Sequence, residues 1–211
     1  MKVKYNIASL FAGCGGLDLG FIQAGFNVSW ANDFSKEAVD SYKKNIGNHI
    51  VCGDITKIPS ADIPDDIDIV LGGFPCQGFS IANKNRSMQD QRNFLYLELI
   101  RVIKDKQPKF FVAENVKGLL SIHKGAVMDI ILEDFKALGY NVDYKLLKAS
   151  NYGVPQNRER VFIIGNRLGL ENPFPEISHG HDNLFNNELK PYVTVKDVCS
   201  DLENVRTRDK S

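Results

Sequence analysis

The chain has 211 residues, 43% of them hydrophobic, which is enough to bury one substantial core and excludes a largely disordered protein. Lys and Arg together number 26, as do Asp and Glu, so the net charge carries no global signature of nucleic-acid binding. No apolar run approaches the roughly 20 residues needed to cross a bilayer, and no signal-peptide pattern is found, so we expect a cytoplasmic protein.

Short apolar runs alternate with segments in which apolar residues recur at helical spacing. The runs predict strands over residues 7–11, 27–31, 51–52, 67–71, 109–113, 142–147 and 160–165. The helical spacings predict helices over residues 17–24, 38–42, 95–103 and 127–138. The buried face of the last helix is expected to contain Val127, Ile130, Ile131, Phe135 and Leu138. Ser35 is the expected N-cap of the second helix, and residues 193–202 predict a strand end and a short helix.

Strands that alternate with helices predict an α/β fold, with an open, mostly parallel, twisted sheet and helices on both faces. Ligands of such Rossmann-like sheets bind beyond the carboxyl ends of the strands. The residues expected to collect there are Gly13, Asp33, Asp54, Cys76 and Glu114. From about residue 171 the composition shifts to Pro, Asn and His, so we expect one domain over 1–170 and a linker over 171–211.

A glycine-rich turn follows the first predicted strand, with the sequence Phe11-Ala12-Gly13-Cys14-Gly15-Gly16-Leu17. Glycines let the backbone turn tightly and approach a cofactor of the adenosine type. The dinucleotide fingerprint would place glycine at position 18, where this chain has Asp18, so S-adenosylmethionine fits better than NAD. On this segment alone, a plain turn between a strand and a helix is an equal alternative.

Acidic residues follow the next two predicted strands, where they could bind the ribose and the adenine of such a cofactor. Asp33 stands about 20 residues beyond the glycine turn, where an acid binds ribose hydroxyls. Phe34 could cover the adenine face, and Asp54 could accept a hydrogen bond from the adenine amino group. Each acid alone is more often a helix cap or a solvated residue, but their order favours the cofactor.

Cys76 stands between Pro75 and Gln77, directly after a predicted buried strand. Free cysteines are commonly buried structural residues, but proline and glycines here describe a shaped loop that presents the thiol to a ligand. Residues 83–92 follow with three basic residues against one acid, which fits either a solvated loop or a lid over a nucleic-acid backbone. The wide spacing of the cysteines argues against zinc and disulfides. The histidine pair His179 and His181, which we expect in a loop, has no ligand-like pattern around it, and we predict no metal site.

Glu114 comes after the apolar strand 109–113, at the edge of a core that favours a protonated carboxyl group and suits a proton donor. A loop carboxylate is the alternative. Arg158 and Arg160 alternate before the last predicted strand and would project on one face. They could neutralise phosphate, position Glu114 or hold a base carbonyl oxygen, although such a pair alone is usually a solvated strand edge.

In this order, the segments resemble the cytosine-C5 DNA methyltransferase family. The matching segments are residues 9–17, 32–33, 53–55, 73–80, 92–95, 114–116 and 152–161. As a set they are highly specific, and they cover residues 5 to 166. The resemblance implies an S-adenosylmethionine-dependent methyltransferase fold and DNA (cytosine-5-)-methyltransferase activity on double-stranded DNA, in a restriction-modification system and near the nucleoid.

The resemblance also implies roles for individual residues. The catalytic set would be Cys76 as nucleophile at C6 of a flipped cytosine, Glu114 as acid at N3, and Arg158 and Arg160, with Arg160 holding the base. The S-adenosylmethionine pocket would contain Phe11, Gly13, Gly15, Gly16, Leu17, Asp33, Phe34, Asp54, Ile55, Pro75 and Leu95. Substrate contacts would come from Gln77, Ser80 and Gln156.

The family usually continues into a target-recognition domain and a segment that completes the cofactor pocket, and neither is found here. Residues 191–197 resemble the lead into that part. Three explanations are open: the chain is one subunit of a split enzyme and needs a second subunit, it is a truncated product, or it is an excerpt of a longer protein. In each case we expect this chain alone to methylate poorly or not at all. A tRNA cytosine-C5 methyltransferase and a catalytically silent binding module are the alternative functions.

Overall fold

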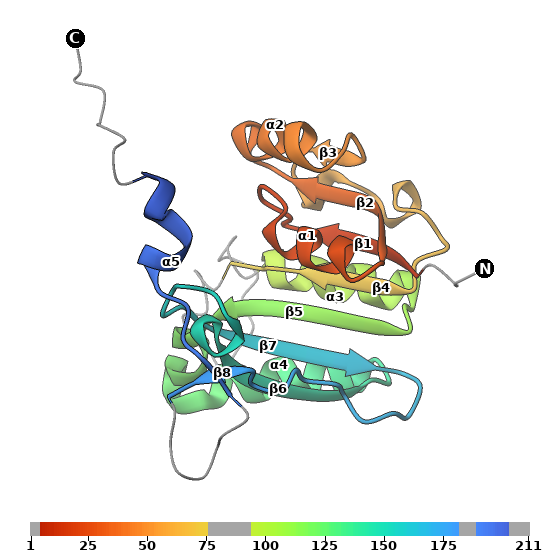
Figure 1. Cartoon of the computed structure of the whole chain (residues 1–211). Coiled ribbons are helices and arrows are strands. Elements are labelled where there is room, and N and C mark those ends of the chain that lie inside the picture. The colour runs from red at the N-terminus through yellow and green to blue at the C-terminus, as the bar shows by residue number, and fades with distance from the viewer. Residues whose placement is uncertain (1–4, 76–93, 182–188, 203–211) are drawn as a thin grey trace. The chain divides into compact units, whose positions relative to one another are not determined.

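The structure is a computed structural model that describes residues 5–75, 94–181 and 189–202 (Figure 1). The chain divides into two compact units, which are described separately. The first unit comprises Met1–Lys145 and Val161–Pro173, and the second comprises Leu146–Arg160 and Phe174–Ser211. None of the described helices is long and apolar enough to span a membrane.

A seven-stranded sheet with the order β3-β2-β1-β4-β5-β7-β6 forms the centre of the first unit. Its strands are β1 (Asn6–Leu10), β2 (Asn27–Asp33), β3 (Ile50–Cys52), β4 (Ile69–Gly72), β5 (Phe110–Val116), β6 (Asn141–Lys148) and β7 (Glu159–Asn166). The pairs β1–β2, β1–β4, β2–β3 and β4–β5 are parallel, whereas the arrow of β7 points opposite to that of β5 (Figure 1). The predicted open, mostly parallel sheet is therefore confirmed.

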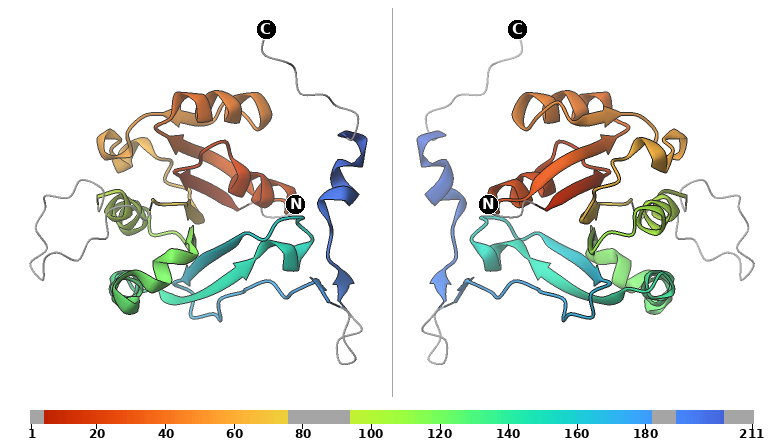
Figure 2. Two further views of the ribbon diagram at one scale, coloured as in Figure 1. Left: turned by 90° about the vertical axis from the view of Figure 1, so that its left-hand side faces the viewer. Right: turned by 90° about the vertical axis from the view of Figure 1, so that its right-hand side faces the viewer.

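Four α-helices connect these strands: α1 (Gly16–Gln23), α2 (Lys36–Asn45), α3 (Phe94–Lys106) and α4 (Ala126–Ala137). Helix α1 lies on one face of the sheet, and α3 and α4 lie on the other (Figure 2), which confirms the predicted layers. Ser35 caps α2 as expected, because its Oγ accepts a hydrogen bond from the Ala38 amide at 3.3 Å. Between β3 and β4 the chain forms two 3-10 turns, η1 (Ile55–Lys57) and η2 (Ser60–Asp62). A further segment, η3 (Lys117–Gly125), joins β5 to α4 and is interrupted by non-helical backbone at Ile122, His123 and Lys124.

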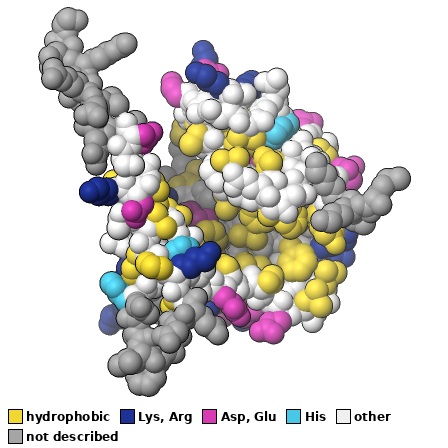
Figure 3. Space-filling view, viewed as in Figure 1, with side chains coloured by type: hydrophobic (Ala, Val, Ile, Leu, Met, Phe, Trp, Pro, Cys, Tyr) yellow, Lys and Arg dark blue, Asp and Glu magenta, His cyan; other side chains and the backbone are white. Residues whose placement is uncertain are grey.

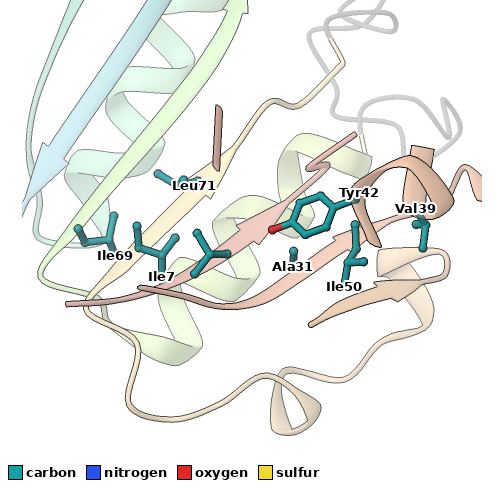
Figure 4. Close-up of a cluster of buried hydrophobic side chains, with 8 residues drawn as sticks. Ile7, Ala31, Val39, Tyr42, Ile50, Ile69 and Leu71 are labelled. Carbon is teal, nitrogen blue, oxygen red and sulfur yellow. The ribbon is translucent and has the colours of Figure 1, made fainter. Parts of the chain in front are cut away.

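One cluster of buried side chains packs α2 onto the neighbouring strands (Figure 4). Its members are Ile7, Val28, Ala31, Val39, Tyr42, Ile50, Ile69 and Leu71. Fully burying one such aliphatic side chain contributes about 1.5–3 kcal/mol, so this cluster fixes α2 and the preceding turn firmly against the sheet. The Tyr42 ring lies within the cluster, and its hydroxyl points away from α2 over the sheet (Figure 4).

Three details differ from the sequence-based predictions. Glu114 and its neighbour Asn115 lie inside β5, because that strand continues to Val116 beyond its last paired residue with β4, Ala113. Ile130 was expected on the buried face of α4 but is 42% exposed. The buried stripe of α4 is instead completed by Met128, which is 2% exposed.

In the second unit, η4 (Ala149–Tyr152) is followed by two short parallel strands, β8 (His179–Gly180) and β9 (Lys190–Pro191). The histidine pair was expected in a loop, and the ladder formed by His179 is a correction. Helix α5 (Val195–Cys199) confirms the short helix expected over residues 193–202, and η5 (Ser200–Leu202) follows it. Thr194 and Asp197 form a reciprocal capping box that begins α5.

Candidate cofactor and catalytic site

Hydrogen bonds hold the carboxyl ends of β1, β2 and β3 together in the first unit. The amide of Ala12 donates to the carbonyl oxygen of Asn32 at 3.0 Å, and the amide of Gly53 donates to that of Asp33 at 3.0 Å. Asn32 is buried, and its Nδ2 donates to the carbonyl oxygens of Val51 at 3.1 Å and Gly53 at 2.9 Å. The glycine turn, Asp33 and the segment before Asp54 are therefore neighbours, as the topology predicted.

The glycine turn adopts a backbone that most residues avoid. Phe11, Gly13 and Gly15 have φ angles of 57°, 58° and 89°, in the left-handed region. Gly15 is the N-cap of α1, where a Cβ would lie 2.1 Å from Ile46 and 2.8 Å from Tyr42. A Cβ on Gly13 or Gly16 would meet no described atom within 4 Å, so the turn is packed tightly on one side and open on the other.

Asp33 orients the glycine turn directly. Its two carboxylate oxygens accept hydrogen bonds from the amides of Gly13 at 2.8 Å and Ser35 at 2.9 Å. Each oxygen has a second lone pair, so the same carboxylate can still accept hydroxyl donors from a ligand. The next side chain, Phe34, is 77% exposed, which is unusual for a phenylalanine and leaves a flat apolar face beside Asp33.

Asp54 acts as a helix cap in the structure, which was the alternative interpretation of this residue. Its Oδ1 accepts hydrogen bonds from the Thr56 amide at 3.1 Å and the Thr56 hydroxyl at 2.8 Å. These hydrogen bonds lower the pKa of Asp54 below its ordinary value, so the carboxylate stays charged at neutral pH. Ile55 follows with its side chain buried.

Arg101 of α3 fixes the turn that carries Asp54 and was not identified from the sequence. Its guanidinium donates to the carbonyl oxygens of Ile55 at 3.2 Å and Ile58 at 3.0 Å, and to the hydroxyl of Ser60 at 2.6 Å. Glu98 pairs with the same group at 2.6 Å. Three separate parts of the η1–η2 segment are thus held by one side chain.

A second group of predicted residues meets where β4 and β5 end. A Cβ placed on Gly73 would lie 3.8 Å from Oε2 of Glu114 and 3.9 Å from the carbonyl oxygen of Phe11. The Glu114 carboxyl group therefore lies beside the backbone that leads into Pro75, which is exposed. Cys76, Gln77 and Ser80, together with the lid proposed over residues 83–92, lie outside the described residues.

The remaining predicted residues are placed as follows. Leu17 and Leu95 are half-buried in the first unit, near the starts of α1 and α3. Gln156, Arg158 and Arg160 belong to the second unit. Gln156 and Arg158 are exposed. Arg160 is half-buried at the start of β7, where its Nη1 donates to the carbonyl oxygen of Glu159 at 2.8 Å.

A buried polar chain lies under the glycine turn, and nothing in the sequence indicated it beyond an unexpected acid at position 18. Asp18 is 0% exposed and accepts hydrogen bonds from Ser9 Oγ at 2.6 Å and Tyr42 Oη at 2.8 Å. The Tyr42 oxygen also lies 3.0 Å from Nε2 of His49. Burial raises the pKa of Asp18, and the hydrogen bonds from Ser9 and Tyr42 oppose that shift.

Within the described parts of the chain, no group of three or more His, Cys, Asp or Glu side chains could hold a metal ion. Basic and acidic side chains are interspersed over the visible described surface, without one dominant charged patch (Figure 3). Cys14 and Cys52 are exposed and Cys199 is partly exposed.

Comparison with known proteins gives consistent matches. A sequence model of the family described as C-5 cytosine-specific DNA methylase matches residues 5–210. The Type II methyltransferase M.NgoFVII of Neisseria gonorrhoeae is 48% identical over 94% of this chain and 54% of its own length. The Type II methyltransferase M.AquIA of Picosynechococcus sp. is 42% identical over 95% of this chain and 90% of its own. The chain therefore spans about half of M.NgoFVII but most of M.AquIA.

Solved structures agree with these matches. A DNA modification methyltransferase encoded within an E. coli prophage has a TM-score of 0.71 and 31% identity, covering 93% of this chain and 54% of that one. A DNMT2 variant from Spodoptera frugiperda has a TM-score of 0.66 and 25% identity, covering 81% and 52%.

Proposed function

Because this chain belongs to the C-5 cytosine-specific DNA methylase family, we propose that it supplies the cofactor-binding and catalytic part of a DNA cytosine-C5 methyltransferase. The observation that carries this proposal is the meeting of Phe11, Gly73 and Glu114 at the carboxyl ends of β1, β4 and β5. The proposed nucleophile, Cys76, follows Gly73 by three residues. The name Type II methyltransferase, shared by the relatives, supports a role in restriction-modification.

The strand-end cluster fits S-adenosylmethionine, which supplies an electrophilic methyl group when bound. The open side of Gly13 and Gly16 gives the backbone a place to approach a ligand closely. We propose that Asp33 accepts the ribose hydroxyls and that exposed Phe34 covers the adenine ring. Asp54 keeps a charged carboxylate available for the adenine amino group, because its Thr56 contacts leave Oδ2 with only a 3.9 Å ion pair to Lys57 among the described residues.

The proposed chemistry at the base follows from the reactivity of cytosine. C5 is a weak nucleophile while the ring is aromatic, so the Cys76 thiolate adds to C6 and Glu114 provides a proton or hydrogen bond at N3. C5 then takes the methyl group, and loss of its proton with expulsion of the thiolate restores the ring. The base must leave the duplex for this reaction, at a cost of a few kcal/mol. Arg160, and with it Arg158, is proposed to hold the extruded cytosine.

Target recognition is proposed to come from protein beyond these 211 residues, either as a further segment or as a second subunit. The chain covers about half of M.NgoFVII, so the relative has room for such a part. This chain covers 90% of M.AquIA, so that relative is nearly as short as this chain. Its length is compatible with target recognition by a separate subunit. Residues 171–211 would then lead toward the recognition part.

The proposal is tested by trapping the covalent adduct. The chain, expressed together with the coding sequence that follows it, is incubated with S-adenosylmethionine and a DNA duplex that contains 5-fluorocytosine, which cannot lose a proton from C5. We expect a covalent protein–DNA adduct, which the Cys76→Ala variant should not form. A tRNA that contains 5-fluorocytosine should give no adduct. An adduct with tRNA alone would replace DNA as the substrate, and binding of the cofactor without any adduct would favour a silent module.

A further inference from the structure

We propose that Asp18 and Tyr42 form a buried brace that holds the glycine turn in the conformation that binds the cofactor. Both are positioning residues, since neither is expected to touch the cofactor, and the inference rests on the proposed function. The brace joins three elements, because Ser9 lies in β1, Asp18 in α1 and Tyr42 in α2.

The Ser9–Asp18 hydrogen bond closes the base of the glycine turn. Ser9 Oγ lies 2.6 Å from Oδ1 of Asp18, and the residues between them are 10–17. This closed segment contains Phe11, whose φ of 57° is a strained conformation for a residue with a side chain. Such a conformation persists only where the surroundings over-determine it, and a hydrogen bond that pins both ends of the turn does this.

Tyr42 supports the same turn in two ways. Its hydroxyl donates to Oδ2 of Asp18 at 2.8 Å. Its ring packs so closely on the start of α1 that a Cβ on Gly15 would lie 2.8 Å from the ring carbons. The hydrophobic cluster fixes the ring itself, as Figure 4 shows, so Asp18 is held by a donor that cannot move away.

His49 completes the chain of donors. A tyrosine hydroxyl has one proton, which Tyr42 donates to Asp18, so the Tyr42 oxygen can accept a hydrogen bond from the His49 tautomer that carries its proton on Nε2, 3.0 Å away. The Asp18 carboxylate thus receives two hydroxyl donors, one of them polarised by a further donor. These hydrogen bonds offset the free-energy cost of burying the Asp18 carboxylate, and each donor also helps to fix the position of that carboxylate.

The proposal is tested with Tyr42→Phe, which keeps the packing ring and removes only the hydroxyl. Tyr140→Phe is the matched control, because Tyr140 is equally buried and its hydroxyl donates to the Pro108 carbonyl oxygen at 2.7 Å, elsewhere in the first unit. Hydrogen exchange of a peptide that covers residues 10–17 reports the order of the turn without any cofactor. We expect faster exchange there in Tyr42→Phe and unchanged exchange in the control.

Cofactor binding provides the second measurement, using the chain with the coding sequence that follows it. We expect Tyr42→Phe to weaken the Kd for S-adenosylmethionine by roughly tenfold, with kcat at saturating cofactor nearly unchanged, while Tyr140→Phe keeps the wild-type Kd. Unchanged exchange and unchanged Kd in Tyr42→Phe would overturn the brace. A wild-type protein that does not bind the cofactor would instead refute the proposed function, whereas the exchange result would still decide whether the brace orders the turn.

Discussion

Asn115 donates a hydrogen bond from its Nδ2 to the carbonyl oxygen of Phe74 at 2.9 Å, and both residues are 2% exposed. Asn115 also accepts a hydrogen bond from the Val116 amide at 2.9 Å, so the residue after Glu114 is fixed to the backbone two residues before Cys76. In the proposed reaction, Glu114 is the acid and Cys76 is the nucleophile. One buried amide therefore connects the strand that carries the acid with the segment that leads to the thiol.

Asn115→Ala should lower methyl transfer by roughly tenfold or more, because small displacements of reacting groups are costly in rate. It should also reduce the free energy of unfolding by about 1–3 kcal/mol, since the Phe74 carbonyl loses its partner. Single-turnover kinetics and urea unfolding measure the two effects. Asn166→Ala is the control, as Asn166 is buried and bonds the Leu170 carbonyl at 2.8 Å, and it should lose stability with little change in rate. Equal rate losses in the two variants would contradict the connection.

Arg101→Lys should weaken S-adenosylmethionine binding several-fold. A lysine ammonium cannot make the planar set of contacts by which Arg101 reaches the carbonyl oxygens of Ile55 and Ile58 and the hydroxyl of Ser60. The turn that carries Asp54 would then be less ordered, and isothermal titration measures the change in Kd. Lys104→Met removes an exposed charge from the same helix and should leave the Kd unchanged. A similar loss in both variants would indicate a general electrostatic effect instead.

How far the sequence predicts this fold and site depends on the distance over which each signal acts. The strand ends and the Ser35 cap follow from local patterns, and the structure confirms them. Asp18 and Arg101 depend on partners 24 and 46 residues away, namely Tyr42 and Ile55. Before those partners are placed, an acid in the first turn of a helix and an arginine on a helix surface look like ordinary solvated residues. Their roles therefore required the tertiary structure.

Gly15→Ala should be far more destabilising than Gly25→Ala. Both glycines have positive φ, 89° and 95°, so each alanine carries a strain of about 1–2 kcal/mol. Only at Gly15 would the new Cβ also lie 2.1 Å from Ile46, whereas at Gly25 it meets no described atom within 4 Å. Overpacking of this kind adds about 1–3 kcal/mol, which urea unfolding of the two variants can resolve. Equal losses would mean that Ile46 and Tyr42 move aside freely.

Acid should destabilise the protein through His49 before the carboxylates titrate. Burial lowers the pKa of His49 below its ordinary value of 6.5, with nearby Asp18 opposing the shift. The folded state then binds fewer protons than the unfolded state between the two pKa values, so the free energy of unfolding falls as the pH decreases through 6.5 toward the folded pKa. The stability linked to this group is fully present above 6.5.

Asp18 has the opposite sign, which separates the two groups experimentally. Its pKa is raised by burial, so the stability linked to it is present below 3.8 and is lost as the pH rises through its folded pKa. His49→Gln keeps a donor for Tyr42 but cannot titrate, and we expect it to flatten the decline in stability between about pH 7 and about pH 5.5, measured by urea unfolding. If the decline persists in His49→Gln, protonation of His49 is not what lowers the stability in mild acid.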